Sequence, residues 1–439
     1  MAMACTRSLQ QALTTAALLA SMAVACCWAR PEAPPPDDDG YRFELTHVDA
    51  GRGFSDDVLM QRAFERSRRR EEALLAAGPV VRSPAELNRK DCEYFMKFKM
   101  GTTKQVPISA LVDTGSNLIW TSNKKCQDSD TLTNLPCGAR CQHANCVCQS
   151  NKCTYSVKYG SNARWSTAGV LRRAKLTFQL AMASGGGTKS FDDVAVGCST
   201  IVDFPDSSVT GIVGLGRGAQ SLHKQLKEKQ LIKSGNFAYC LSAYTKPDRP
   251  SVLLLSASSA PNPNQGRMVN TTGLRKNPSY ESFYFVQLDS ISIGGTQLPI
   301  DDLKQQGDGG NMFVDSGASF TFLVDKAYDE VVKKVDEIMA GKQRTRLGLD
   351  KTNGRICYEG APDETMPDMV LHFAGGADMV LPWRSYLWES TTGPSLCLAF
   401  QKTTKGPSIL GNFQQQGMHM HFDMEKEEMS FVRADCSKL

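Results

Sequence analysis

The chain has 439 residues, of which 41% are hydrophobic and 22% are charged, and its formal net charge is +4. This length is enough for two domains with sizeable cores, and the composition is that of a globular protein. The small charge, with only one short basic run at residues 66–70, gives no basis for a nucleic-acid partner, and we interpret that run as a solvated helix face.

The N-terminus has the features of a targeting segment. Arg7 precedes an uncharged apolar stretch at residues 12–26, and Ala23-Val24-Ala25 fits a signal-peptidase site. A cut after Ala29 fits nearly as well, and we assign residues 1–29 to a signal peptide. No later segment is long and apolar enough to cross a bilayer, so no stable membrane insertion is predicted. An extracellular destination is favoured, and a vacuole or plastid also fits.

Residues 30–87 differ from the rest of the chain. A linker with four prolines and three aspartates occupies residues 31–39, and a strand at 41–48 and a charged helix at 56–77 are predicted to follow it. The segment contains no cysteine, whereas twelve cysteines lie from Cys92 onward. We interpret residues 30–87 as a propeptide, with a small N-terminal subdomain as the alternative.

From Cys92 onward the pattern is β-rich. Short apolar runs alternate with clusters of Gly, Asn, Asp and Ser, for example at residues 157–159, 194–197, 283–288 and 431–433. Amphipathic helices are predicted at residues 221–231 and 326–339. The fold class expected is mostly β.

A weak internal repeat divides this region into two. Residues 111–116 (LVDTGS) are similar to residues 313–318 (FVDSGA), and an apolar-apolar-Gly element ending at Gly214 or Gly411 follows each aspartate after about a hundred residues. Two copies of the same pair of elements imply two lobes with one architecture. A pseudo-twofold relation between them would bring Asp113 and Asp315 face to face.

Two facing aspartates can perform acid–base chemistry. Carboxylates held close together cannot both ionise easily, so they share a proton. One can then act as a base on water while the other donates to a carbonyl oxygen. Gly115 and Gly317 allow a sharp turn at each aspartate, and the hydroxyls of Thr114 and Ser316 can lock the two loops together. A single Asp-Thr/Ser-Gly triplet can also form an ordinary β-turn, so the evidence for a catalytic pair is that two matching copies are present.

At these motifs the sequence resembles the pepsin-like aspartic proteases, and most closely the plant nepenthesin-like subgroup. The resemblance covers roughly residues 93–436 and includes GLGRG at 214–218, FAYCL at 237–241 and GNFQQQ at 411–416. It implies a bilobal β-fold with a central cleft, an N-terminal lobe at 88–265 and a C-terminal lobe at 266–439. It also implies no metal and no cofactor.

The function implied is that of a secreted aspartic endopeptidase made as a zymogen. Asp113 and Asp315 would activate water and cut polypeptide substrates at acid pH, and we expect a monomer. The alternative is an inactive pepsin-fold binding or inhibitor protein, because some plant relatives have lost the catalytic pair. The presence of both aspartates favours the enzyme.

The flap is where the sequence departs from the family. Tyr159 and Gly160 match the start of the flap motif, and Trp120 matches the tryptophan that supports the flap tyrosine. The tip then lacks the usual second glycine, is about two residues longer, and carries Arg164 and Trp165. We expect an altered subsite shape, and this difference keeps the inhibitor alternative open.

The cysteines indicate an oxidising compartment. Six of them lie between Trp120 and Tyr159, where the subgroup has a cysteine-rich insert, and we predict disulfides there, with zinc as the alternative. Cys92 would supply the partner that the insert lacks. The resemblance pairs Cys357 with Cys397.

Three smaller expectations complete the analysis. Asn270 begins the sequon Asn-Thr-Thr and is predicted to be exposed. The arginines of residues 66–70 would pair with acidic groups of the cleft at neutral pH and release them in acid. Ser116 keeps a hydroxyl that Ala318 lacks, so one donor to the carboxylates is lost and their pKa values should rise.

Overall fold

The computed structural model describes residues 40–75, 94–138, 141, 146–159, 165–181, 186–200, 210–257, 269–301, 303, 309–347, 355–361, 364–390, 395–403 and 406–439. Side chains are described throughout these ranges except at residues 69–75 and 158–166. The assigned signal peptide, Cys92 and Gly160 lie outside the described residues.

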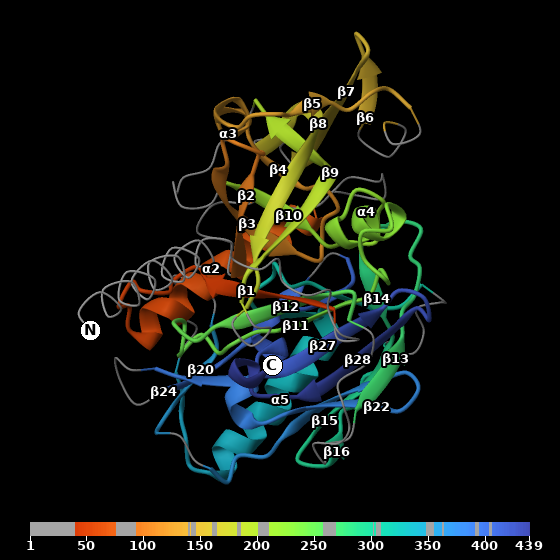
Figure 1. Ribbon diagram of the computed structural model, residues 1–439. Helices are drawn as coiled ribbons and strands as arrows, with labels where there is room; N and C mark the ends of the chain where they lie inside the picture. Colours follow the sequence, from red (N-terminus) through yellow and green to blue (C-terminus); the bar gives the residue numbers. More distant parts are fainter. Residues whose placement is uncertain are drawn as a thin grey trace, which may run out of the picture.

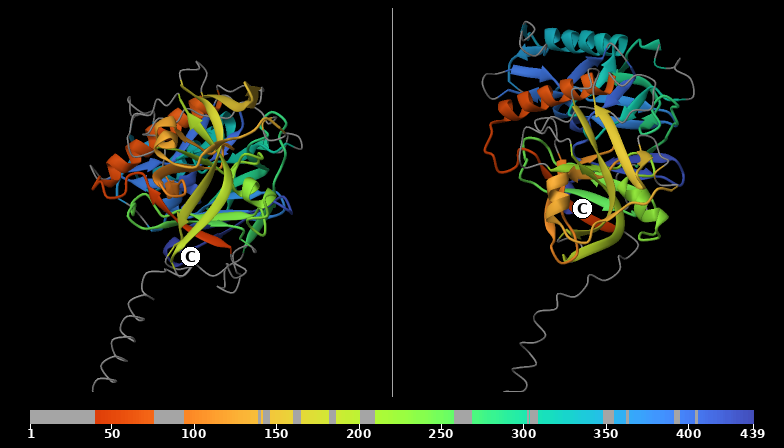
Figure 2. Two further views of the ribbon diagram at one scale, coloured as in Figure 1. Left: turned by 45° about the horizontal axis from the view of Figure 1, so that its top comes forward. Right: turned by 90° about the horizontal axis from the view of Figure 1, so that it is seen from above.

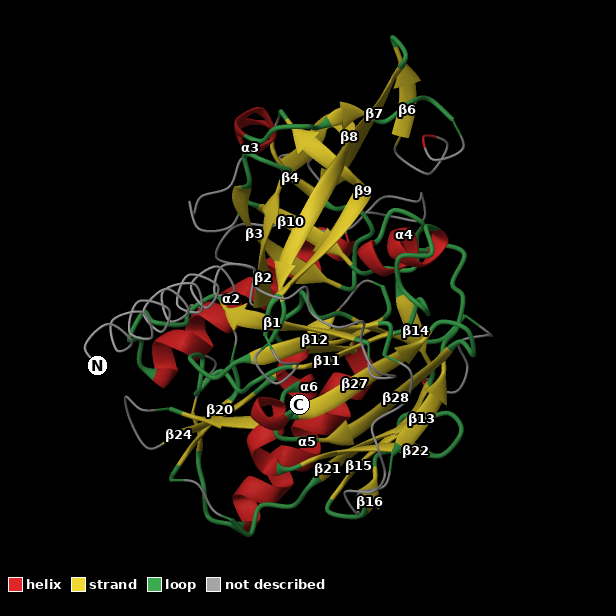
Figure 3. Cartoon of the chain, viewed as in Figure 1, coloured by secondary structure: helices red, strands yellow, loops and turns green. Residues whose placement is uncertain are grey.

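The fold is mostly β and is the bilobal pepsin-like fold that the sequence indicates (Figures 1 and 3). In the described residues a sheet of fifteen strands runs from the first lobe through the middle of the molecule. Its strands are β1 (Tyr41–His47), β2 (Tyr94–Met100), β3 (Val106–Asp113), β4 (Trp120–Ser122), β5 (Thr133–Asn134), β6 (Cys146–Gln149), β7 (Lys152–Tyr159), β8 (Trp165–Gln179), β9 (Thr188–Ser199), β10 (Gly211–Gly214), β11 (Phe237–Cys240), β12 (Ser251–Leu255), β13 (Asn270–Gly273), β27 (Met418–Asp423) and β28 (Glu428–Arg433).

Three smaller sheets build the second lobe. One contains β14 (Tyr284–Val286), β17 (Met312–Val314), β18 (Thr321–Val324), β25 (Phe400–Thr403) and β26 (Ser408–Leu410). The second contains β15 (Leu288–Ile293), β16 (Thr296–Gln297), β21 (Met369–Phe373) and β22 (Ala377–Leu381). The third contains β19 (Arg346–Leu347), β20 (Cys357–Glu359), β23 (Leu387–Glu389) and β24 (Ser395–Leu398).

The helices lie around these sheets, and the predicted ones are present. They are α2 (Asp56–Leu75), α3 (Asn123–Asp128), α4 (Leu222–Glu228), α5 (Asp325–Gly341) and α6 (Asn412–Gln415), with 3-10 turns at Trp383–Ser385 and Cys436–Lys438. Helix α5 buries one face because Ala327, Val331, Val335 and Met339 recur every four residues. No helix in the described part of the chain is long and apolar enough to cross a membrane.

The internal repeat is visible in the strand pairing. The order β2-β3-β10-β4-β9 in the first lobe matches β14-β17-β26-β18-β25 in the second. Successive pairs are antiparallel, parallel, antiparallel and parallel in both sets. The two aspartates end β3 and follow β17, which are equivalent strands. The predicted duplication is thereby confirmed.

Gly214 and Gly411 are required by close approach of backbones. A Cβ atom on Gly214 would fall onto the backbone of Asn117, and one on Gly411 would fall onto the backbone of Phe320. Asn117 and Phe320 belong to the loops that follow the two aspartates. Glycine therefore lets β10 and β26 lie directly against those loops, which explains why each motif is paired with an apolar-apolar-Gly element.

The N-terminal segment is built into the fold. Strand β1 pairs with β12 on one side and with β2 on the other. Helix α2 lies against the second lobe (Figure 2). Its Met60 and Phe64 share a buried cluster with Phe320 and Phe413. The described part of residues 30–87 therefore does not form a subdomain of its own.

The prediction that the basic run is a solvated helix face is wrong for Arg66. Its side chain is fully buried and its Nη1 lies 3.0 Å from Asp49 Oδ2, while Arg62 Nε lies 2.9 Å from Asp49 Oδ1. Burial pushes the pKa of Asp49 up, but Arg66, His47 and Arg62 hold it below its ordinary value. Asp49, the carboxylate that Arg66 contacts, lies within the N-terminal segment, and the expected pairing of residues 66–70 with acidic groups of the cleft stays a prediction.

Five disulfides cross-link the described residues. Two of them, Cys137–Cys148 and Cys141–Cys153, lie within the insert, as the disulfide interpretation requires. Cys126 leaves the insert and bonds Cys198 on β9, and the remaining bonds are Cys240–Cys436 and Cys357–Cys397. Cys146 carries the only free thiol in the described residues, and Cys92, which was predicted to supply a partner for the insert, lies outside them.

Candidate active site

Asp113 and Asp315 occupy equivalent places at the ends of paired parallel strands. The Asp113 carbonyl accepts a hydrogen bond from Leu215 N at 2.8 Å, just beyond β10. The Asp315 amide donates to Leu410 O on β26 at 3.1 Å. Both aspartates are fully buried. The parallel pairs β3–β10 and β17–β26 therefore hold each aspartate at the same point of its lobe.

Reciprocal hydrogen bonds join the two aspartate loops. Thr114 N donates to Ser316 Oγ at 3.1 Å, and Ser316 N donates to Thr114 Oγ1 at 2.9 Å. The hydroxyls then donate onward across the lobes, from Thr114 Oγ1 to Val314 O and from Ser316 Oγ to Val112 O, both at 3.2 Å. Each hydroxyl is thus acceptor and donor at once. The structure brings together the two loops that the sequence placed about two hundred residues apart.

Each aspartate also receives an amide from its own loop. Gly115 N donates to Asp113 Oδ1 at 3.0 Å, and Gly317 N donates to Asp315 Oδ1 at 2.8 Å. Such bonds fix the orientation of a carboxylate within its loop. The first glycine after each Asp-Thr/Ser pair therefore supplies a backbone donor, and the carboxylates are oriented by their loops.

Ser116 and Ala318 correct part of the sequence-based picture. The Ser116 hydroxyl is buried and makes no hydrogen bond in the described residues, so it does not donate to a carboxylate. The Ala318 methyl belongs to a buried apolar cluster with Phe283, Phe313 and Ile409. Position 318 is therefore packed by aromatic rings, which the repeat alone does not reveal.

A second layer of side chains supports the Asp315 loop and was missed by the sequence analysis. Asn412 Nδ2 donates to Ser316 O at 2.9 Å, and Tyr244 Oη donates to Asn412 Oδ1 at 2.7 Å. Tyr239 Oη donates to Gln415 Oε1 at 2.6 Å. Burial and the Asp315 charge raise the pKa of Tyr239 well above its usual value, so it remains a donor. The Asn- and Gln-rich run at residues 412–416 was the available signal for this layer, because it directly follows the apolar-apolar-Gly element that ends at Gly411.

The flap hairpin is formed by β7 and β8, with Tyr159 opposite Trp165 in its register. Gly160 and the rest of the tip lie outside the described residues, as does the Tyr159 side chain. Trp120 is buried and shares a cluster with Tyr155 and Val157 of β7. Trp120 therefore packs at the base of the hairpin.

The sequon does not lie on an exposed loop as predicted. Asn270 is half-buried at the start of β13, which pairs with β28, and its Oδ1 accepts from Asp378 N at 3.2 Å. Thr272 is buried. Strand pairing thus covers a site that the local sequence alone presents as open.

The described residues contain no group of three or more His, Cys, Asp or Glu side chains able to hold a metal ion. In the insert, the disulfides occupy thiols that the zinc alternative would need as ligands.

Two matching β-lobes, each contributing an Asp-Thr/Ser-Gly loop to one buried junction, define the chain as a protein of the pepsin-like aspartic protease class. Family models described as xylanase inhibitor N-terminal and C-terminal match residues 94–255 and 283–433. The chain is 32% identical to aspartic proteinase nepenthesin-1 of Nepenthes gracilis, covering 90% of each chain, and 29% identical to aspartyl protease family protein 2 of Arabidopsis thaliana, covering 80% and 72%. The chain belongs to the plant pepsin-like aspartic protease family.

Solved structures of the same fold are more distant in sequence. The structure titled edgp has a TM-score of 0.69 at 16% identity and covers 92% of this chain and 98% of that chain. Basic 7S globulin from soybean has a TM-score of 0.64 at 15% identity and covers 78% and 93%. At this identity the likeness concerns the fold alone.

Proposed function

We propose that the protein is an aspartic endopeptidase that hydrolyses peptide bonds at acid pH through Asp113 and Asp315. The observation that carries the proposal is the reciprocal pair of Thr114 and Ser316 hydrogen bonds, which locks the two aspartate loops together. A binding protein on the same fold would have no need for both carboxylates on two equivalent, amide-oriented loops. Relatives named as aspartic proteinases support the same choice.

In the proposed mechanism the two carboxyls share one proton. The ionised carboxylate takes a proton from water as the water oxygen bonds to the peptide carbonyl carbon, and the protonated carboxyl gives its proton to the carbonyl oxygen. The carboxyl that took the proton from water then gives it to the departing nitrogen, one hydroxyl of the diol returns its proton to the other carboxylate, and the carbon–nitrogen bond breaks. The products are a carboxylic acid and an amine, and the pair of aspartates regains its single proton.

The direct test replaces one carboxylate at a time. Asp113→Asn and Asp315→Asn should each abolish turnover of a protein substrate at acid pH while leaving the circular dichroism spectrum unchanged, because the amide keeps the shape but cannot act as the base. The unaltered, processed enzyme should be inhibited by pepstatin. Near-normal turnover by either folded variant would overturn the proposal.

We also propose that the protein matures by removal of its N-terminal segment. A signal peptide at 1–29 would send the chain to the secretory pathway, and residues 30–87 would be removed in acid to give the active enzyme. The N-terminal sequence of the active form tests this. An active form that still contains Tyr41 would contradict removal of the segment.

A second candidate is an inhibitor or binding protein. The matching family models are described as xylanase inhibitor domains, and the flap tip differs from the protease pattern. If the processed protein folds but cleaves no protein substrate, inhibition of a microbial xylanase is the next assay. Inhibition by both Asp→Asn variants, with no turnover by the unaltered protein, would favour this candidate.

A further inference from the structure

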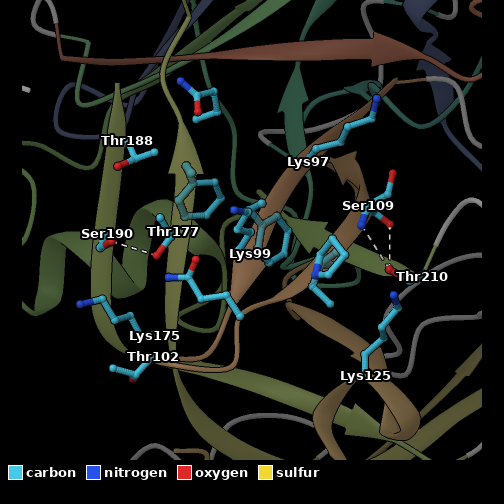
Figure 4. Close-up of a pocket in the computed structure, with 16 residues that line it drawn as sticks. Lys97, Lys99, Thr102, Ser109, Lys125, Lys175, Thr177, Thr188, Ser190 and Thr210 are labelled. Carbon is cyan, nitrogen blue, oxygen red and sulfur yellow. Dashed lines mark hydrogen bonds between the residues drawn. The ribbon is translucent and has the colours of Figure 1, made fainter. Parts of the chain in front are cut away.

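A large cavity bordered by lysines lies in the first lobe, among residues that the proposed chemistry does not use. It has a volume of about 630 Å³ and is lined by β2, β3, β8 and β9, with Lys125 of α3 at its edge (Figure 4). Its lining residues include neither aspartate of the candidate site and no residue of their loops.

The cavity is strongly basic. Lys97 and Lys99 of β2, Lys175 of β8 and Lys125 all line it, and none of its described lining residues is Asp or Glu. Lys175 has one carboxylate neighbour, the exposed Asp192 at 3.7 Å. For the other three lysines, no ion pair with a described residue is present. Four lysine side chains thus border one cavity, and such a cluster of positive charges raises the local concentration of anions.

Asp130 stands beside the cavity but does not neutralise it. Its carboxylate accepts hydrogen bonds from the amides of Thr102 and Thr103 at 2.8 and 2.9 Å, and from the Thr103 hydroxyl. The Thr103 hydroxyl and nearby backbone amides hold the pKa of Asp130 well below its usual value. Asp130 therefore stays ionised, and its single negative charge offsets only part of the positive charge of the four lysines.

The rest of the lining is rich in hydroxyl groups. Thr177 and Ser190 hydrogen-bond across β8 and β9 at 2.9 Å, and Thr210 bonds the Ser109 backbone at 3.2 Å. The aromatic lining residues, Phe98 and Phe178, are buried against each other with ring centroids 5.1 Å apart. The cavity therefore offers cations and hydroxyls, and no exposed ring of its lining is available for a base to stack on.

We propose that this cavity binds an acidic polysaccharide, with the lysines pairing with uronate carboxylates and the hydroxyls pairing with sugar hydroxyls. Lysine ammonium groups are point charges that accept anions of many geometries, which suits carboxylates spaced along a flexible chain. A single-stranded nucleic acid would gain most from exposed aromatic platforms, which are missing among the described lining residues. An acidic protein partner would need apolar or aromatic anchors at the centre of its interface.

The test measures binding of polygalacturonate to the full-length protein by isothermal titration calorimetry at about pH 6, where both uronates and lysines are charged. Fully methyl-esterified polygalacturonate is the matched ligand control, because it keeps the sugar chain and removes the charges. The double variant Lys97→Gln/Lys99→Gln removes two exposed cations from the cavity. The control variant Lys246→Gln/Lys333→Gln removes two exposed lysines outside the cavity, so its net charge equals that of the cavity variant.

The proposal expects binding of the unesterified chain, weaker binding at higher salt, and roughly tenfold weaker binding by the cavity variant. The control variant should bind like the unaltered protein. Equal loss in both double variants would show a general charge effect and overturn the site. Equal binding of the esterified chain, or tighter binding of single-stranded DNA, would overturn the ligand class. The Asp113→Asn variant should bind the polysaccharide unchanged, so this test is independent of peptidase activity.

Discussion

Removal of the Thr114 hydroxyl is the perturbation that tests most directly how the two lobes are held together. In Thr114→Ala, Ser316 N loses its acceptor and Val314 O loses a donor, and both hydrogen bonds cross between loops that lie about two hundred residues apart in sequence. Both hydroxyl-bearing side chains of this pair are buried, Thr114 fully and Ser316 with 4% exposure. Water therefore has little access to replace the lost bonds.

The expected cost follows from these two backbone groups. A buried donor or acceptor left without a partner costs about 1–3 kcal/mol, so two of them should lower the free energy of unfolding by about 2–6 kcal/mol. That is a large fraction of the roughly 5–15 kcal/mol that typically separates folded from unfolded protein. Thr114→Ser keeps both hydrogen bonds and loses one methyl group, so it should cost only about 1 kcal/mol.

The assay is urea unfolding at neutral pH, followed by circular dichroism, with peptidase turnover measured in parallel at acid pH. Thr114→Ala should unfold at lower urea than Thr114→Ser with the same dependence on urea. Ser316→Ala should repeat the effect, since its hydroxyl has the mirrored bonds. Unfolding free energies of Thr114→Ala and Thr114→Ser that agree within about 0.5 kcal/mol would refute the importance of this junction.

Three further predictions concern other parts of the fold. Burial, Arg66 and Arg62 lower the pKa of His47 to about 3, against 6.5 when exposed, so its contribution to stability is complete above pH 6.5 and is lost as the pH falls toward 3. This difference in pKa corresponds to about 5 kcal/mol, so His47→Gln should remove roughly that much of the loss in unfolding free energy that the unaltered protein shows in acid; an unchanged pH dependence would contradict this. Gly214→Ala should cost at least about 3 kcal/mol, because its Cβ would meet the backbone of Asn117; a normal urea midpoint would show that the loop can move aside. Ala318→Ser would place a hydroxyl among Phe283, Phe313 and Ile409, so this variant should lose about 1–3 kcal/mol of unfolding free energy, and a normal urea midpoint would show that the hydroxyl finds a hydrogen-bond partner there.

The parts of the fold that depend on local pattern were predictable from sequence. Alternating apolar runs gave the strands, and the apolar stripe of residues 326–339 gave α5 within two residues at each end. The duplication of the Asp-Thr/Ser-Gly motif predicted two similar lobes, because two copies of one pair of elements are expected to fold alike and to be related by a pseudo-twofold axis. The two aspartate loops could be placed for the same reason.

Features set by distant contacts were not predictable in this way. Charge and helical period made Arg66 look solvated, yet Asp49 lies in the turn after β1 and reaches it only once α2 folds back. Cys126 looked like a member of the insert until the packing of α3 against β9 brought it to Cys198. Asn270 illustrates the same limit, since its burial comes from pairing with β28, far along the chain.

The N-terminal segment and the candidate active site are coupled through the second lobe. Ser67 Oγ of α2 accepts a hydrogen bond from Phe320 N, five residues after Asp315. The Arg66 guanidinium lies 6.0 Å from the centre of the Tyr244 ring, and Tyr244 holds Asn412, which in turn holds the Ser316 carbonyl. Removal of the segment would therefore leave the Phe320 amide and the Tyr244 ring without groups that now cover them. Because both lie next to the loop that orients Asp315, the proposed removal of the segment would rearrange the surroundings of the site as well as uncover it.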